Sequence, residues 1–234
     1  MNEDGSMARL PQLELIAEKF DVKIISIKDL IEYRLKTDSL IEEVVRVEMP
    51  TAFGHFQLIA FREKETAQEH LALIKGEWEE GDPVMVRVHS SCVTGDIFGS
   101  CRCDCGAQLH NAMEMVEKAG KGVVLYMFQE GRGIGIGNKI AAYALQEQGL
   151  NTYEANEKLG LPKDSRNYID AIWIFKALNI NDFYLMSNNP EKINALTKAG
   201  LTFNILQVGV TTTSHNQQYL ADKIEIGKHT IKFN

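Results

Sequence analysis

All four cysteines of this chain lie between residues 92 and 105, and the other positions carry none. A fold held by disulfides would spread its cysteines along the sequence to close long loops. The clustering therefore predicts a chain that folds around an ordinary hydrophobic core in a reducing compartment, with its cysteines available to bind a metal ion. With 234 residues, 44% of them hydrophobic, the chain is long enough for one large domain, or for a domain with an appendage.

The formal net charge of −7 argues against broad binding to nucleic acid or acidic membranes, which favour a basic protein surface. It permits an anionic small substrate, because a few local cations and backbone N–H groups suffice for that. No apolar run approaches the roughly 20 residues of a membrane helix. The polar, acidic start from Met1 to Asp4 does not resemble a secretory signal. We therefore expect a cytoplasmic protein that binds neither nucleic acid nor membranes.

Strand and helix patterns alternate beyond a charged stretch over residues 36–43, where we place a domain boundary. Strands are predicted over 84–88, 122–128 and 183–186, and helices over 108–118, 138–148, 166–178 and 189–199. Strands that alternate with helices predict a layered α/β/α domain with a mixed sheet. The last 25 residues show no clear pattern.

A short α/β appendage is expected before that boundary. The sequence predicts a helix over 13–20, a strand over 23–27 and a second helix over 28–35. Ser26 with Asp29 is the pattern of a capping box, in which each side chain accepts a hydrogen bond from the other's backbone at the start of a helix.

The cysteine spacing is Cys-x8-Cys-x-Cys-x-Cys. Alternate residues of an extended segment face the same side, so the last three thiols could converge with Cys92, in the turn after strand 84–88. Zinc favours tetrahedral sulfur and nitrogen ligands. Three cysteines leave a position open to water and suit catalysis, whereas four close the site and make it structural. The spacing favours metal binding over a thiol nucleophile or buried structural thiols, and leaves the number of ligands open.

A glycine-rich turn from Glu130 to Lys139 joins a predicted strand to a predicted helix, where backbone N–H groups can meet phosphate. Its glycine spacing fits neither the dinucleotide fingerprint nor the Walker A loop, so a simple tight crossover stays open. Basic side chains at the ends of predicted elements indicate an anion site, although each alone could be a solvated surface charge: Arg87, Arg102, Arg132, Lys139, Arg166 and Lys192.

Together these motifs resemble GTP cyclohydrolase II. The resemblance is carried by the segment from Arg87 to Asp96 followed by Cys103-Asp104-Cys105-Gly106, and continues through residues 129–135, 143–146, 164–166 and 188–192. It covers roughly residues 45 to 220. The family pattern Cys-x10-Cys-x-Cys implies that one catalytic zinc ion is bound by Cys92, Cys103 and Cys105, and that Cys101 is not a ligand.

The resemblance implies the chemistry as well. The family opens the imidazole ring of GTP, releases formate and pyrophosphate, and gives 2,5-diamino-6-(5-phosphoribosylamino)pyrimidin-4(3H)-one, as the first step of riboflavin biosynthesis. It assigns the nucleophile at the α-phosphate to Arg166 and the proton acceptor to Asp164, and it places Tyr143 near the zinc water. The alternative for Arg166 is that it only stabilises phosphate charge, as arginine commonly does.

Positions for binding GTP follow from the same resemblance, together with magnesium on the triphosphate and a homodimer. Ser187 stands where many members carry threonine and retains the hydroxyl. The matched binding positions are Arg87, Val88, His89, Ser90, Ser91, Gln108, Glu130, Gly131, Arg132, Thr152, Ser187 and Lys192.

Residues 1–43 look like the tail of 3,4-dihydroxy-2-butanone 4-phosphate synthase, which precedes the cyclohydrolase in bifunctional riboflavin proteins. The resemblance rests on residues 2–11, 24–27 and 30–34. We therefore expect a remnant of that domain over 1–43 and a cyclohydrolase domain over 44–234. The catalytic segments of the synthase are missing, so no synthase activity is expected, and the remnant is either a truncation or a docking element.

Two other functions remain open: a related cyclohydrolase that keeps a formyl group on its product, and a zinc-stapled nucleotide-binding module without turnover. The intact set of Cys92, Cys103, Cys105, Asp164 and Arg166 favours the enzyme. The stretch from Gly209 to Asn234 departs from the expected family ending, which leaves closure over the phosphates and dimer contacts open.

Overall fold

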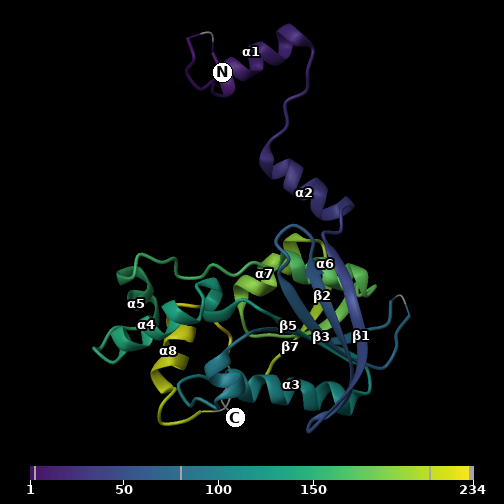
Figure 1. The fold of residues 1–234 in the computed structure, drawn as a ribbon, viewed down its shortest axis with the longest axis vertical. Coiled ribbons are helices and arrows are strands. Elements are labelled where there is room, and N and C mark those ends of the chain that lie inside the picture. Colours follow the sequence, from purple (N-terminus) through teal and green to yellow (C-terminus); the bar gives the residue numbers. More distant parts are fainter. Residues whose placement is uncertain (3, 80, 211, 232–234) are drawn as a thin grey trace. The chain divides into compact units, whose positions relative to one another are not determined.

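The computed structural model describes residues 1–2, 4–79, 81–210 and 212–231 (Figure 1). The chain divides into two compact units, Met1–Asp38 and Ser39–Asn234. The division lies a few residues before the predicted boundary at 43/44, because the first strand of the larger unit already begins at Ile41. No helix within these described ranges is long and apolar enough to cross a membrane.

The smaller unit contains two helices, α1 (Leu10–Phe20) and α2 (Ile27–Thr37). The capping box that opens α2 is confirmed: the Asp29 N–H donates to Ser26 Oγ at 3.0 Å, and the Ser26 N–H donates to the Asp29 carboxylate at 3.4 Å. The strand predicted over 23–27 is wrong. Residues 23–26 have no regular secondary structure, Ile27 already begins α2, and no strand among the described residues of this unit pairs with this stretch.

The larger unit is built on one seven-stranded sheet in the order β1-β2-β3-β5-β4-β6-β7. The first three strands and β5 pair antiparallel, whereas β5, β4, β6 and β7 run parallel, so the predicted mixed sheet is confirmed. The strands are β1 (Ile41–Thr51), β2 (Gly54–Glu63), β3 (Glu69–Lys75), β4 (Val84–Ser90), β5 (Gly122–Met127), β6 (Asp182–Met186) and β7 (Thr202–Leu206).

Helices cover both faces of this sheet, with α3 on one face and α6 and α7 on the other (Figure 1). Local signals set several ends: α3 stops at Gly120, which takes the left-handed conformation, and α7 begins where the Asn189 side chain accepts from two backbone N–H groups. The helices are α3 (Cys105–Ala119), α4 (Ile136–Gln146), α5 (Thr152–Lys158), α6 (Ile169–Ala177), α7 (Pro190–Lys198) and α8 (Gln217–Glu225).

The crossovers place a crevice at the carboxyl ends of β4 and β5. The connection from β4 to β5 passes through α3 on one face, whereas the connection from β5 to β6 passes through α6 on the other. Ligands of open α/β sheets bind where neighbouring connections diverge in this way. Ser90 and Met127, paired at the ends of the two strands, mark that edge.

The aromatic packing under β6 gives a test of the core. Phe183 is fully buried, with ring centroids 5.3 Å from both Phe175 and Phe203. We expect Phe183→Ala to lower the free energy of unfolding by about 3–5 kcal/mol, through lost burial and an unfilled cavity. Tyr184→Ala, at the next position but 41% exposed, should cost less than about 1 kcal/mol. Urea unfolding of both variants makes the comparison, and equal costs would contradict this packing.

Candidate metal and nucleotide site

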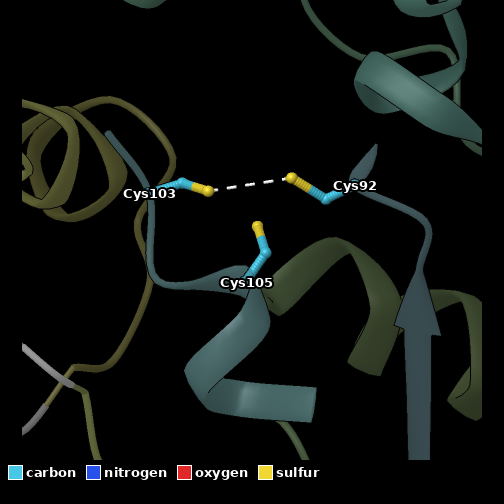
Figure 2. Close-up of side chains that lie close together, drawn as sticks. All are labelled: Cys92, Cys103 and Cys105. Carbon is cyan, nitrogen blue, oxygen red and sulfur yellow. Dashed lines mark hydrogen bonds between the residues drawn. The ribbon is translucent and has the colours of Figure 1, made fainter. Parts of the chain in front are cut away.

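Three thiols converge at the carboxyl end of β4 (Figure 2). Cys92 follows the strand, Cys103 lies in the next loop and Cys105 is the first residue of α3. Their sulfur atoms all lie within 4.8 Å of one another, and Cys92 Sγ is 3.7 Å from Cys103 Sγ. Two sulfurs bound to one tetrahedral zinc ion at about 2.3 Å would be about 3.8 Å apart. The spacing of the thiols therefore suits zinc.

Cys101 lies outside this group. Its thiol is exposed and lies 3.9 Å from the Gly99 carbonyl oxygen. Residues 101–104 form turns and not the extended segment that the alternating spacing suggested, so Cys101 and Cys103 do not share a side. The structure thus brings together the three cysteines of the family pattern and leaves the fourth apart.

Gly95 supplies the room in which the thiols meet. A Cβ atom on Gly95 would lie 2.9 Å from Cys103 Sγ and 3.1 Å from Cys92 Sγ, closer than real side chains pack. A Cβ on Gly106 would lie 2.4 Å from the Gly95 carbonyl oxygen. The backbone of the loop after β4 therefore contacts the backbone at the start of α3. The three thiols surround a small space beside this contact, and thiolates are soft ligands that suit zinc.

A buried cation and a carboxylate support Cys92. Lys139 Nζ donates to Cys92 Sγ at 3.1 Å and to Glu130 Oε1 at 2.8 Å, and Glu130 Oε2 accepts from the Val93 N–H. Hydrogen bonds from the Cys103 and Cys105 thiols, and then the Lys139 charge, lower the pKa of Cys92 against the effect of burial. These contacts favour the thiolate of Cys92, which is the form that binds metal, whereas the neighbouring thiols and burial raise the pKa of Cys105.

Tyr143 reaches the thiol cluster through Thr94. The two hydroxyl oxygens are 3.4 Å apart, and Thr94 Oγ1 is 3.6 Å from Cys92 Sγ. Burial raises the pKa of Tyr143, so its hydroxyl keeps its proton at neutral pH.

His89 and Asp96 form a second buried pair beside the cluster. His89 Nε2 is 3.1 Å from each Asp96 oxygen, and Asp96 Oδ2 also accepts from the Cys92 N–H at 2.9 Å. Burial, as the largest effect, lowers the pKa of His89. Asp96 therefore fixes the backbone of the first thiol while it orients the histidine ring.

One pocket holds the thiol cluster and most of the predicted substrate positions. Val88 and Asp164 do not line it: the Val88 carbonyl accepts from Lys192 Nζ, and Asp164 pairs with Arg166. The predicted residues that do line it are Arg87, His89, Ser90, Ser91, Cys92, Cys103, Cys105, Gln108, Glu130, Gly131, Arg132, Tyr143, Thr152, Arg166, Ser187 and Lys192.

The lining of this pocket also includes buried positive charge. Lys192 is 4% exposed, and burial followed by the charges of Arg87 and Arg166 lowers its pKa well below the usual value. Arg87 Nε and Arg132 Nη1 are buried without a hydrogen-bond partner within the described part of the chain. A phosphate group would compensate the buried positive charge and would also accept hydrogen bonds from these guanidinium groups.

Arg166 precedes α6 and is held by Asp164 two residues before it. Arg166 Nε donates to both Asp164 oxygens, at 3.0 and 3.1 Å, and the Arg166 N–H donates to Asp164 Oδ1. Burial opposes the charge, but Tyr168 and Asp164 raise the pKa of Arg166 overall. The helix predicted from residue 166 begins only at Ile169, so this pair sits in the loop before it, and Arg166 alone of the two lines the pocket.

Several pocket residues were missed as substrate positions. Lys139 was noted only as a cation, and the asparagines carried no charge or spacing to mark them. Tyr219, Lys223 and His229 come from the C-terminal stretch that gave no clear pattern, although the spacing of Tyr219 and Lys223 is that of one helical turn. The unpredicted lining residues also include Arg102, Asn156, Asn188 and Asn189.

The fold and the site define a layered α/β protein with a cluster of three thiols that could hold a metal ion, in a pocket that is also lined by buried cations. The chain matches the family model for GTP cyclohydrolase II over residues 42–205, and it belongs to that family.

Curated relatives agree with this assignment. The chain is 58% identical over 232 residues to "Riboflavin biosynthesis protein RibBA" of Cytophaga hutchinsonii, which covers 99% of this chain and 57% of the relative. It is 51% identical to the protein of the same name from Phocaeicola vulgatus, over 100% of this chain and 58% of the relative. The chain thus spans less than two thirds of these relatives.

A solved structure is also similar in part. It is described as RibBX, a two-domain 3,4-dihydroxy-2-butanone 4-phosphate synthase from A. baumannii, with 26% identity and a TM-score of 0.46. The match covers 91% of this chain and 52% of that one.

The space beside Gly95 gives a test of the metal site. Because its Cβ would press on two thiols, we expect Gly95→Ala to weaken zinc binding at least about tenfold, the effect typical of a displaced metal environment. Gly137→Ala is the control: nothing lies within 4 Å of that position in α4, and alanine suits a helix better than glycine. Zinc affinity is measured by competition with a chelator, and unchanged affinity of Gly95→Ala would contradict the geometry.

Proposed function

We propose that this chain is a zinc-dependent GTP cyclohydrolase II that hydrolyses GTP with release of formate and pyrophosphate. The observation that carries the proposal is that the three-thiol cluster and the buried cations line one pocket. In a purine nucleoside triphosphate, the ring could lie at the thiol cluster while the phosphates bind the buried cations. Membership of the GTP cyclohydrolase II family and the names of the curated relatives support this substrate.

Cys92, Cys103 and Cys105 are the residues that would hold zinc. When bound, zinc would supply Lewis acidity that activates water for attack on C8 of the guanine ring. Lys139 donates to Cys92 Sγ and so orients it, and Asp96 fixes its backbone. The protonated Tyr143 hydroxyl can donate a hydrogen bond near the reacting ring.

The cationic end would hold the triphosphate and its magnesium ion. Arg87 is fixed by donation to the Met186 carbonyl at 2.9 Å and to Gln108 Oε1 at 2.6 Å, so its buried Nε remains for substrate. Lys192, whose charge burial opposes, gains most from an anion in the pocket.

Arg166 and Asp164 would act at the α-phosphate. Asp164 raises the pKa of Arg166, so Arg166 is a cation before substrate binds and can stabilise negative charge on phosphate. A nucleophilic Arg166 would have to lose a proton, and the Asp164 carboxylate, 3.0 Å from Nε, is placed to accept it. The family resemblance favours Arg166 as the nucleophile. The geometry of its ion pair with Asp164 is compatible with that role and with stabilisation of phosphate charge.

The remaining assignments concern the whole protein. We propose that residues 1–43 belong to a segment like the end of a dihydroxybutanone phosphate synthase domain, and that residues 44–234 form the cyclohydrolase domain. We also propose a homodimer that works in the cytoplasm in riboflavin biosynthesis, on the family resemblance and the names of the relatives.

Turnover decides among the candidate functions. We expect zinc-loaded protein with GTP and magnesium to give formate, pyrophosphate and the diaminopyrimidine phosphate, identified by mass. A product that retains the formyl group would move the chain to a related cyclohydrolase. GTP that binds without change would leave a nucleotide-binding module.

The cysteines give a matched pair of variants. Cys103→Ser should lose zinc and activity together, because a hydroxyl is a far weaker zinc ligand than a thiolate. Cys101→Ser should keep both, since the Cys101 thiol is exposed and apart from the cluster. Metal content by atomic absorption and the turnover assay are measured on both. Zinc retained in the first variant, or lost in the second, would reject the three-cysteine assignment.

A further inference from the structure

Helix α8 lies beyond residue 205, where the family model ends, yet it forms part of the pocket. Tyr219 and Lys223 on α8 line the pocket, and so does His229 just after it. Helices that only complete a domain rarely bury charged side chains, but Asp222 and Lys223 are 5% and 8% exposed. Their partners explain why they are buried.

Lys223 holds the loop that carries the metal ligands. Lys223 Nζ donates to Asp104 Oδ1 at 2.6 Å, across 119 residues of sequence. Asp104 stands between Cys103 and Cys105, and its side chain is 0% exposed. The other Asp104 oxygen accepts from Gln108 Nε2 at 2.7 Å. A buried carboxylate needs such partners, so removal of Lys223 would leave Asp104 under-compensated in the middle of the metal loop.

Asp222 holds the opposite wall of the pocket. Asp222 Oδ2 accepts from the Thr152 N–H at 3.2 Å and from Thr152 Oγ1 at 3.1 Å. Thr152 is the first residue of α5 and lines the pocket as a predicted GTP-binding residue. Neighbouring residues of α8 therefore contact two walls that are far apart in sequence.

The chain after α8 contacts a third wall. The His229 N–H donates to the Lys223 carbonyl at 3.0 Å, and the Thr230 N–H donates to the Asn188 carbonyl at 3.2 Å. Gly227 permits this return, because a Cβ there would lie 2.6 Å from the Tyr153 hydroxyl and 2.8 Å from the Lys223 carbonyl oxygen.

We propose that α8 completes the pocket by holding two of its walls in place. Lys223 is a positioning residue for the loop that carries Cys103 and Cys105, and Asp222 is a positioning residue for the proposed GTP-binding residue Thr152. The inference rests on the proposed function and extends it to a helix outside the family model. It assigns separate effects to two neighbouring residues, which a merely stabilising helix would not show.

Lys223→Met tests the contact of α8 with the loop that carries the metal ligands. We expect zinc affinity, measured by chelator competition, to fall at least about tenfold, as is typical when a residue that orients a metal ligand is lost. Lys223→Arg should recover part of the loss. Lys198→Met removes an exposed lysine of α7 and should leave zinc affinity unchanged. The absorption spectrum of the cobalt-substituted protein shows whether the thiolate geometry changes, and wild-type affinity and spectrum in Lys223→Met would overturn the proposal.

Asp222→Ala tests the contact of α8 with Thr152. We expect the KM for GTP to rise about fivefold, the effect of losing one or two hydrogen bonds, while zinc affinity stays at the wild-type value. Gln218→Ala is the matched control and should leave the KM unchanged, because Gln218 Nε2 donates to the other Asp222 oxygen, at 2.9 Å, and not to the one that holds Thr152. An unchanged KM, or equal loss of zinc and GTP binding in Asp222→Ala and Lys223→Met, would reduce α8 to a stabilising helix. Wild-type protein that binds neither zinc nor GTP would instead refute the proposed function.

Discussion

The contact between Gly95 and Gly106 is the constraint on which the site depends. With no side chain on either residue, the loop after β4 can lie directly against the first turn of α3. That approach brings Cys92 from the loop to Cys103 and Cys105 at the helix, within the range of one metal ion. The parallel pair β4 and β5 holds both parts in place, because α3 is the crossover that joins them. The arrangement of the three thiols therefore depends on the connection from β4 to β5 through α3 as well as on the cysteines themselves.

The charged groups around this contact are unequally satisfied. Asp96, Asp104 and Glu130 each accept from a specific donor, namely the Cys92 N–H, Lys223 and Lys139. Arg87 Nε and Arg132 Nη1, in contrast, have no hydrogen-bond partner in the part of the chain that is described. Buried donors of this kind suit an anion, even in a chain of net charge −7.

The sequence predicted those parts of the fold whose local pattern agrees with their tertiary surroundings. Val84–Ser90 and Gly122–Met127 are buried on both faces and read as apolar strands, and Gly120 and Asn189 mark helix ends by their own chemistry. Strand β1 was missed because most of its residues are exposed, so no alternation shows. Helix α8 was missed because Asp222 and Lys223, which a sequence pattern assigns to a solvated face, are buried against distant partners. For the same reason the thiol set needed the family pattern: only the turns over 101–104 remove Cys101 from it.

The position of α8 in the chain has a consequence for biogenesis. A ribosome completes the cysteine loop long before it adds Lys223, which follows Asp104 by 119 residues. Until then the Asp104 carboxylate lacks its ammonium partner, and Thr152 lacks Asp222. The nascent chain can therefore form its sheet and helix α3 while the pocket is still open on one side. If the three thiols hold zinc as proposed, stable loading would follow the synthesis of α8, which supplies the partner of Asp104.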